Sequence, residues 1–315
     1  MDKIDLFAHV LLPKYYNKML SIDPNIPNEY SFTNIESLKD MTIRKKLWNK
    51  ETKQIISYAN INAEDYCTPQ SSAKYVREAN EELIKCIKEN KDMFPYGIGM
   101  VPFNNIEESL KILEEIKSSK ELIGIQVFTR HLGKSIADIE FRPILKKCEE
   151  LGLLVLLHPV FDNRKPDNNI VFSWEYELSL AMMQLVQSNI FEECPNIKII
   201  VHHAGAMVPF FAGRINNILK DKKEEFKKFY VDTAILGNSK ALELTIDYFG
   251  IDHVLYGTDA PFGIMPNGAT KEIEKAINKL PISYKDREKI YNKNIKKLIN
   301  KNERKDWLYE KTNRR

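Results

Sequence analysis

The sequence predicts a single (β/α)8 barrel, an α/β TIM-barrel fold, with an insertion after its first strand and a helical extension at its C-terminal end. Eight short apolar segments recur along the chain, and helical patterns separate nearly all of them. Most of these segments are apolar throughout, which is typical of strands buried on both faces of a parallel sheet. No linker divides the 315 residues, so we expect one domain over 1–315. An open doubly wound sheet is the structural alternative, but no glycine-rich phosphate-binding motif follows the first strand.

The first half of the chain contains five of the predicted strands. In the first of them Asp5, Phe7 and His9 occupy alternate positions, so their side chains share one face. Gly152 ends the third predicted helix, as glycine commonly does. We expect strands at 4–12, 54–60, 96–103, 122–128 and 153–157, and helices at 72–91, 106–117 and 139–151.

The second half repeats the alternation. Its first strand starts at Ile197 and continues into the adjacent pair His202 and His203. The remaining strands are expected at 229–234 and 253–257, and the helices at 174–191, 208–219, 242–249, 271–279 and 284–300.

Two segments lie outside the regular alternation. Residues 13–51 carry aromatic side chains, proline breaks and short helical patches, and an excursion placed directly after a strand suits an active-site cover better than a linker. The other is a basic tail at 299–315, where 301–315 holds six Lys or Arg against three Asp or Glu. A solvated helix or a frayed terminus explains that tail.

Composition excludes several classes of function. A net charge of +3 is too small to indicate nucleic-acid binding. No apolar run approaches the ~18–20 residues needed to cross a bilayer, and no signal peptide opens the chain. The cysteines show no CxxC spacing and are expected to be reduced thiols of a cytoplasmic protein: Cys67, Cys86, Cys148 and Cys194.

Ionisable residues gather at the expected carboxyl ends of the strands, where barrel enzymes place their active sites. His9 ends the first strand, His158 the fifth, His203 the sixth and Asp259 the eighth. Imidazoles and a carboxylate that converge from separate strands can bind a divalent metal with a position left for water or substrate. His203 beside such a metal would serve as a general acid or base. For each residue alone, a structural polar group at a strand end is the simpler explanation.

These residues carry a resemblance to a family. The chain resembles the amidohydrolase-related metal-dependent hydrolases of the aminocarboxymuconate semialdehyde decarboxylase type, from Ile4 to about Gly263. Each motif is weak alone, but their order and spacing are specific. The motifs are IDLFAHVLLP at 4–13, LHP at 157–159, HAGA at 203–206 with the following Pro209 and GRI at 213–215, and YGTDAPF at 256–262.

The resemblance implies roles for individual residues. His9 corresponds to the second histidine of an HxH metal-binding pair, and His158 to a further metal ligand. His203 corresponds to the histidine taken as catalytic in the decarboxylases. Asp259 corresponds to a ligand or a participant in proton transfer. His202 has no fixed role in the pattern, and strand alternation turns it away from His203, which predicts a structural role for it.

Phe7 is the departure from the pattern, because it occupies the first position of the HxH pair and a phenyl ring cannot bind a metal. Two hypotheses compete. In the first, His9, His158 and Asp259 still bind zinc with water, and Phe7 forms an apolar wall against the substrate. In the second, the metal is lost and the protein is a degenerate barrel that binds a small ligand. We favour the enzyme, because the other positions have little reason to remain together in an inert barrel.

The function predicted is therefore that of a metal-dependent carboxy-lyase (a non-oxidative decarboxylase) or hydrolase of a small carboxylated aromatic, dienoic or cyclic substrate. The expected cofactor is a divalent ion, with zinc preferred and manganese as the alternative. Arg130, Trp174 and Phe262 are further candidates for contact with the substrate. No nucleic-acid or membrane partner is expected, and a homodimer is considered for the assembly.

Overall fold

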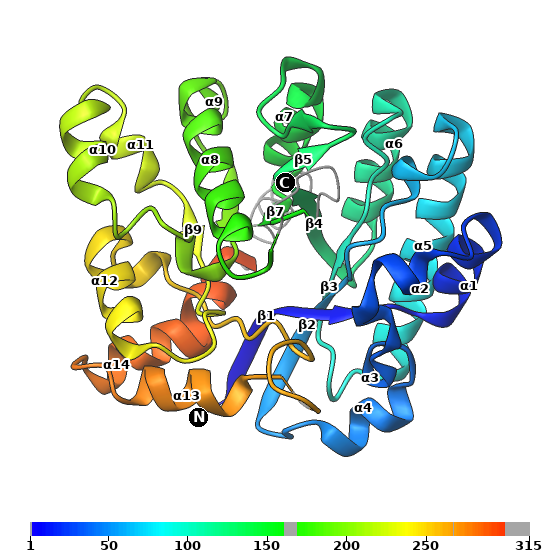
Figure 1. Cartoon of the computed structure of the whole chain (residues 1–315), viewed down its shortest axis with the longest axis horizontal. Coiled ribbons are helices and arrows are strands. Elements are labelled where there is room, and N and C mark those ends of the chain that lie inside the picture. Colours follow the sequence, from blue (N-terminus) through cyan, green and yellow to red (C-terminus); the bar gives the residue numbers. More distant parts are fainter. Residues whose placement is uncertain (1, 161–168, 267, 300–315) are drawn as a thin grey trace, which may run out of the picture.

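The structure, a computed structural model, describes residues 2–160, 169–266 and 268–299, and its helices surround a central parallel sheet (Figure 1). The sheet has seven strands in the order β1-β2-β3-β4-β7-β8-β9, and every neighbouring pair is parallel. This arrangement confirms the predicted barrel class. The strands are β1 (Lys3–Val10), β2 (Thr52–Tyr58), β3 (Gly97–Gly99), β4 (Leu122–Phe128), β7 (Leu154–His158), β8 (Lys198–Val201) and β9 (Tyr230–Val231).

The predicted eighth strand at 253–257 is wrong in detail, because within the described residues this segment forms only an isolated bridge of Val254 with Val231, and a second isolated bridge, of Ala260 with Ala8, follows it. The segment nevertheless completes the barrel. On one side its backbone is held by Leu255 N, which donates to Val231 O at 2.8 Å. On the other side Asp259 N donates to Phe7 O at 2.8 Å. Asp259 has a φ of 61°, so the chain leaves extended geometry where the side chain enters the site.

Helices cover the outside of the sheet, and their ends follow from local sequence. Thr68 caps α5 by accepting from Ser71 N, and Pro69 occupies the first helical position, where no N–H is needed. Gly152 adopts the left-handed conformation with φ 68° and ends α7 as expected. The outer helices are α5 (Pro69–Glu89), α6 (Ile106–Ser118), α7 (Arg142–Leu151), α8 (Ser173–Gln187), α9 (Ile190–Glu193), α10 (Ala212–Ile218), α11 (Lys223–Phe226), α12 (Ser239–Phe249), α13 (Thr270–Asn278) and α14 (Tyr284–Glu288).

The insertion at 13–51 consists of short helices beside β1 and α5 (Figure 1). Arg44 ties it to the barrel, because its buried guanidinium donates to His9 O at 2.6 Å and to Gln54 Oε1 at 2.9 Å. Satisfying these acceptors offsets the cost of burying the charge. The insertion contains α1 (Pro13–Ile22), α2 (Ile26–Glu29), a 3-10 turn (Ser31–Asn34), α3 (Glu36–Lys39) and α4 (Met41–Leu47).

Two apolar clusters form the core, because successive strand residues face opposite sides of the sheet. The larger cluster fills the space between the strands and the helices, with Ile56, Ile125 and Val155 among its members. The smaller one fills the barrel interior and includes Phe7, which is fully buried. No helix in the described part of the chain is both long and apolar enough to cross a membrane. Most of the basic tail at 299–315 lies outside the described residues.

Candidate metal centre and active-site cavity

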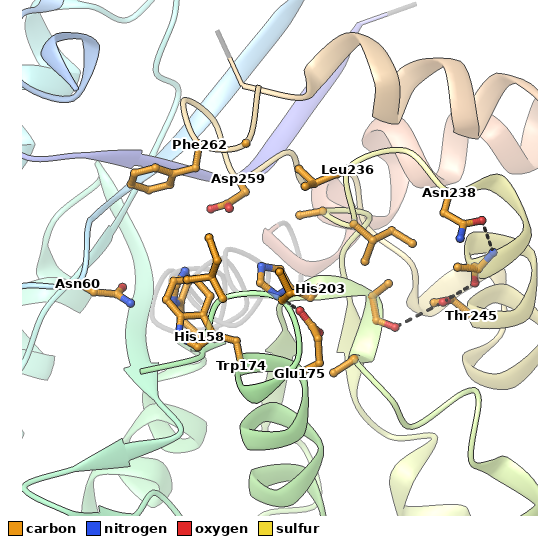
Figure 2. Close-up of a pocket in the computed structure, with 18 of the residues that line it drawn as sticks. Asn60, His158, Trp174, Glu175, His203, Leu236, Asn238, Thr245, Asp259 and Phe262 are labelled. Atoms are coloured by element: carbon orange, nitrogen blue, oxygen red, sulfur yellow. Dashed lines mark hydrogen bonds and ion pairs between the residues drawn. The ribbon is translucent and has the colours of Figure 1, made fainter. Parts of the chain in front are cut away.

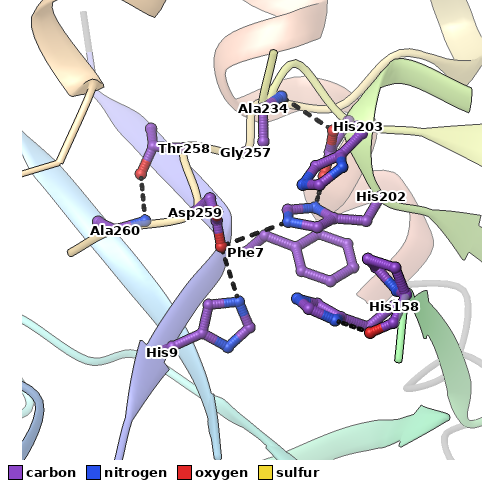
Figure 3. Close-up of polar contacts among 12 residues, drawn as sticks. Phe7, His9, His158, His202, His203, Ala234, Gly257, Thr258, Asp259 and Ala260 are labelled. Carbon is purple, nitrogen blue, oxygen red and sulfur yellow. Dashed lines mark hydrogen bonds and ion pairs between the residues drawn. The ribbon is translucent and has the colours of Figure 1, made fainter. Parts of the chain in front are cut away.

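Four side chains converge at the carboxyl ends of the strands: His9, His158, His202 and Asp259 (Figure 3). They come from the end of β1, the end of β7, the residue after β8 and the segment that closes the barrel. One nitrogen or oxygen atom of each lies within 4.8 Å of those of the others. Asp259 Oδ1 is 3.1 Å from His9 Nε2 and 3.4 Å from His202 Nε2. The parallel strands deliver all four groups to one point.

Hydrogen bonds fix the tautomers of the first two histidines. The Ser57 hydroxyl donates to Gln126 Oε1 at 2.7 Å, so Ser57 Oγ is an acceptor for His9 Nδ1 at 3.1 Å. His158 Nδ1 lies 2.8 Å from the carbonyl oxygen of Pro159, which can only accept. In both rings Nδ1 therefore carries the proton, and the Nε2 lone pair is left for the centre of the cluster.

Asp232 fixes the orientation of His202 and the proton on its Nδ1. Its Oδ2 accepts from His202 Nδ1, and its Oδ1 accepts from Ala204 N at 3.0 Å and from Ala234 N at 2.9 Å. The carboxylate is fully buried and is held in one orientation by these donors. A carboxylate on the outer nitrogen of a histidine is the usual partner of a metal-binding imidazole, because it fixes the ring and raises its basicity.

The electrostatic environment shifts the pKa values of the four groups in different directions. Burial lowers the pKa of His9 and lowers that of His158 well below its usual value, so both rings are neutral. Burial opposes the charge on His202 as well, but Asp232 and Asp259 outweigh it and raise the pKa of His202 to about 10. Burial alone would raise the pKa of Asp259, whereas the neighbouring His202 and His9 lower it well below 3.8. The cluster is thus built around an ionised carboxylate.

The atoms at the centre of the cluster fit a divalent cation. His9 Nε2, His202 Nε2 and Asp259 Oδ1 are buried, and within the described residues none of them has a hydrogen bond of acceptable geometry despite their short separations. Three imidazole nitrogens and one carboxylate oxygen are ligands that zinc accepts, and manganese also accepts carboxylate and imidazole. The donor set therefore suits the divalent ion expected from the sequence.

A cavity of about 670 Å³ opens above this cluster, with His158 and Asp259 at its floor (Figure 2). Its walls are largely apolar and aromatic, and Trp174 and Phe262 are among them. Phe32 from the insertion packs edge-on against Phe262 with a ring separation of 5.7 Å. The described lining is Glu29–Phe32, Asn60, His158, Ile170, Val171, Trp174, Glu175, His203, Ala204, Ala206, Pro209, Phe210, Ala234–Leu236, Asn238, Ala241, Leu244, Thr245, Asp259, Phe262 and Gly263.

His203 lies in the cavity wall and outside the four-residue cluster. Its Nδ1 donates to Glu175 Oε1 at 2.7 Å, and its ring stacks on Trp174 at 6.3 Å with an interplanar angle of 24°. The backbone of His203 has φ 53° and that of Ala204 has φ 57°, both in the left-handed region. Because of this bend, the side chains of His202 and His203 point in different directions.

The structure thus places most of the candidate residues around one site. His9, His158 and Asp259 lie together in the cluster, and His203, Trp174 and Phe262 line the cavity above it. Two candidates for substrate contact are not among the described lining residues. Phe7 is fully buried under the cluster with its ring 4.2 Å from that of His202, and Arg130 lies 2.8 Å from Glu177 Oε1.

The expectation that His202 turns away from the site is wrong. Strict alternation applies only inside a regular strand, and β8 ends at Val201, so His202 is free to point into the barrel before the left-handed bend at His203. Sequence reasoning also missed Asp232, Glu175 and Ser57, which orient the histidines. Asp232 directly follows β9, but the strand predicted at 229–234 placed it inside the strand and hid its likeness to the other strand-end residues.

Comparison with known proteins gives a family match for this chain. The amidohydrolase family matches residues 68–301, which is more than half of the chain. The chain belongs to the amidohydrolase family. This amidohydrolase is 25% identical over 303 residues to the 2-amino-3-carboxymuconate-6-semialdehyde decarboxylase of Dictyostelium discoideum, with 82% of each chain covered. It is 29% identical over 212 residues to the 6-methylsalicylic acid decarboxylase of Penicillium expansum, which covers 60% of this chain and 64% of that protein.

Solved structures show the same fold. One of them is the dihydroxybenzoic acid decarboxylase of Polaromonas sp. JS666, solved with manganese and the inhibitor 2-nitroresorcinol. It superposes on this chain with a TM-score of 0.77 at 19% sequence identity. The match covers 95% of this chain and 97% of that one. At this identity the likeness establishes the barrel architecture and leaves the substrate open.

Proposed function

We propose that this amidohydrolase is a metal-dependent carboxy-lyase that removes a carboxylate, without oxidation, from a small aromatic or dienoic acid. The observation that carries the proposal is the cluster of three histidines and Asp259 at the floor of an apolar cavity. The relatives whose names describe decarboxylases of 2-amino-3-carboxymuconate-6-semialdehyde and of 6-methylsalicylic acid favour decarboxylation over hydrolysis.

The cation would be held by His9, His158, His202 and Asp259, and either zinc or manganese suits these ligands. When bound, it would supply Lewis acidity to an oxygen of the substrate. The tautomers set by Ser57 and by the Pro159 carbonyl turn ligating lone pairs towards it without any proton loss from those two rings. His202, with its pKa of about 10, would release its Nε2 proton on binding the cation.

The cavity walls would orient a flat substrate. Trp174 and Phe262 present aromatic surfaces on either side of the space above Asp259 (Figure 2). Apolar walls exclude water from the reacting carbon, which strengthens electrostatic interactions there. We infer that Phe32 places the insertion at 13–51 over the substrate as a cover, because Glu29–Phe32 form part of the cavity wall.

His203 is the proposed proton donor. As the bond between the substrate carbon and its carboxylate breaks, the carboxylate leaves as carbon dioxide and the electron pair stays on the carbon. A proton on His203 Nε2 passes to that carbon, and the ring regains a proton from solvent for the next turnover. Glu175 accepts from Nδ1 at 2.7 Å, so the proton that is passed on is the one on Nε2. Asp259, besides holding the cation, would assist this proton transfer through its position at the cavity floor.

The proposal is tested by metal analysis and by an assay for carbon dioxide release. Protein purified without chelators should contain zinc or manganese, or take one of them up on titration. It should then release carbon dioxide from at least one member of a panel of hydroxylated benzoic acids and dienoic acids. Absence of any uptake would instead favour a metal-free barrel that binds a small ligand. Metal uptake with a hydrolysis product and no carbon dioxide would overturn the decarboxylase assignment.

We also propose a cellular location and an assembly for the protein. Four free cysteines, three of them buried, support a reducing cytoplasmic environment. A homodimer remains a prediction, which light scattering of the purified protein would test.

A further inference from the structure

Two aromatic rings lie beside the His203 imidazole, but they do not determine which of its edges faces the cavity. Trp174 stacks on it with an interplanar angle of 24°, and the His202 ring lies 4.1 Å away at 37°. These neighbours fix the plane of the imidazole. A half-turn about the Cβ–Cγ bond would keep that plane and exchange Nε2 with Cε1. Stacking therefore cannot decide which atom the ring presents to the cavity.

Glu175 makes that choice. It lies in the first turn of α8, and its Oε1 is 2.7 Å from His203 Nδ1 (Figure 2). A carboxylate only accepts hydrogen bonds, so the contact selects both the half-turn and the tautomer with the proton on Nδ1. The Glu175 side chain is 24% exposed and that of His203 is 9% exposed, so little water competes for the bond. Nε2 is thereby left for the cavity.

The same helix also fixes the backbone that carries His203. Ser179 lies one turn after Glu175, on the same face of α8, and its Oγ accepts from Met207 N at 3.0 Å. On the other side Asp232 Oδ1 accepts from Ala204 N at 3.0 Å. With the backbone held from both sides, the loss of Glu175 would free the ring without displacing its Cα.

We propose that Glu175 is the positioning residue of His203, which sets the orientation and tautomer of the ring so that Nε2 faces the substrate. The chemical use of that nitrogen rests on the proposed function, whereas the setting of the ring does not. A packing role for Glu175 would need only its volume, which glutamine preserves. A positioning role needs a hydrogen-bond acceptor that carries no N–H donor. Glutamine carries both an acceptor and a donor, so it can pair with either form of the ring, and alanine carries neither.

The experiment compares Glu175→Ala and Glu175→Gln with the native chain and with Glu107→Ala. Glu107 is a control of the same kind, because it also lies in the first turn of a helix, α6, but is 81% exposed on the surface. Nitrogen NMR of protein labelled with 15N-histidine, as purified and with zinc added, reports the tautomer of each ring at a pH where the ring is neutral. The spectrum of a His203→Gln variant identifies the His203 signals.

We expect His203 to be a single Nδ1–H tautomer in the native chain and in Glu107→Ala, and a mixture of tautomers in both Glu175 variants. For the accepted substrate, kcat should fall about 10–100-fold in both variants, as is usual for lost orienting partners, and KM and bound metal should change little. A native tautomer in both variants, or a native kcat in Glu175→Gln, would overturn the proposal. If the native chain releases no carbon dioxide, the proposed function fails, and the tautomer measurement still decides the role of Glu175.

Discussion

Phe7 and His202 occupy adjoining places in the barrel, with ring centroids 4.2 Å apart and an interplanar angle of 27°. Phe7 lies where the resemblance implies a histidine ligand, and His202 lies where it implies none. The stacked phenyl ring excludes water from one face of His202, and Asp232 orients its other nitrogen. We infer that His202 supplies the third imidazole that Phe7 cannot supply.

Metal affinity should therefore depend on His202 and on Asp232, which orients it. Asp232→Asn should weaken binding of zinc or manganese about 10–100-fold, since outer partners of ligating histidines have effects of this size, and His202→Ala should weaken it at least as much. Isothermal titration of the metal-free protein measures both. His253→Ala is the control, because His253 donates to Phe229 O at 2.9 Å and stacks on Tyr230 away from the cluster. Native affinity in His202→Ala would exclude His202 as a ligand.

Asp5 is a second buried carboxyl, fully enclosed beneath the site. Its Oδ1 accepts from Thr258 N at 3.0 Å, and its Oδ2 is 2.5 Å from Thr258 Oγ1. Burial outweighs these hydrogen bonds and raises the pKa of Asp5 from 3.8 to about 7. The folded chain thus holds the Asp5 proton more tightly than the unfolded chain does. The stability from this group is fully present below pH 3.8 and is lost as the pH rises towards 7.

Asp5→Asn should abolish this dependence, because the amide is neutral at every pH and has a similar shape. The free energy of unfolding of the variant, relative to the native chain, should rise between pH 4 and pH 7 by up to about 4 kcal/mol. Urea unfolding of both metal-free proteins at several pH values measures the difference. Parallel curves over this interval would show that Asp5 does not titrate there.

Gly124 of β4 lies directly against the backbone of β7. A Cβ added to Gly124 in β4 would lie 2.3 Å from Leu154 O and 2.8 Å from Leu154 Cβ. Both are parts of the neighbouring strand, whose pairing runs from Gly124 with Leu154 to Phe128 with His158. A side chain at Gly124 would therefore push β4 and β7 apart and disturb the pairing that positions His158.

Gly124→Ala should consequently lower the free energy of unfolding by at least about 3 kcal/mol, because backbone atoms cannot move away without breaking the pairing. Gly213 in α10 provides the matched control, since a Cβ there meets nothing within 4 Å. Gly213→Ala should be neutral or stabilise by up to about 1 kcal/mol through helix propensity. Urea unfolding followed by circular dichroism distinguishes the two; equal effects would contradict this account of β4.

At the scale of the whole molecule, the cluster joins segments that are far apart in the chain. His9 comes from the first strand and Asp259 from the segment that closes the barrel, and the backbone links them through Asp259 N to Phe7 O at 2.8 Å. A cation held by both would connect the first and last parts of the sheet. The unfolded chain has no such site, so binding would stabilise the fold.

Zinc or manganese should therefore raise the thermal midpoint of the metal-free protein. At a free concentration 100 times the dissociation constant the expected gain is about 2.7 kcal/mol, which corresponds to a shift of several degrees. Differential scanning calorimetry measures it, and a chelator should reverse it. His158→Ala should show a much smaller shift at the same metal concentration; an undiminished shift would place the cation elsewhere.

The sequence by itself determined the alternation of strands and helices, and therefore the barrel. It also placed His9, His158 and Asp259 at strand ends, which the structure brings into one cluster. Parallel strands share one carboxyl edge, so residues at their ends meet whatever their separation in the chain. The eighth strand was predicted less well, because its position is set by backbone bonds to β9 and β1, which are not local in sequence.

Only the tertiary structure decided the direction of His202 and the partners of the histidines. The left-handed backbone at His203 is held by two bonds, from Ala204 N to Asp232 and from Met207 N to Ser179 of α8, and each joins residues 28 positions apart in the chain. Glu175 and Ser57 carry no pattern that distinguishes them from other polar residues until folding places them on Nδ1 of His203 and His9. Strand position can be inferred from local periodicity, whereas the orientation of a ring depends on hydrogen bonds between distant segments.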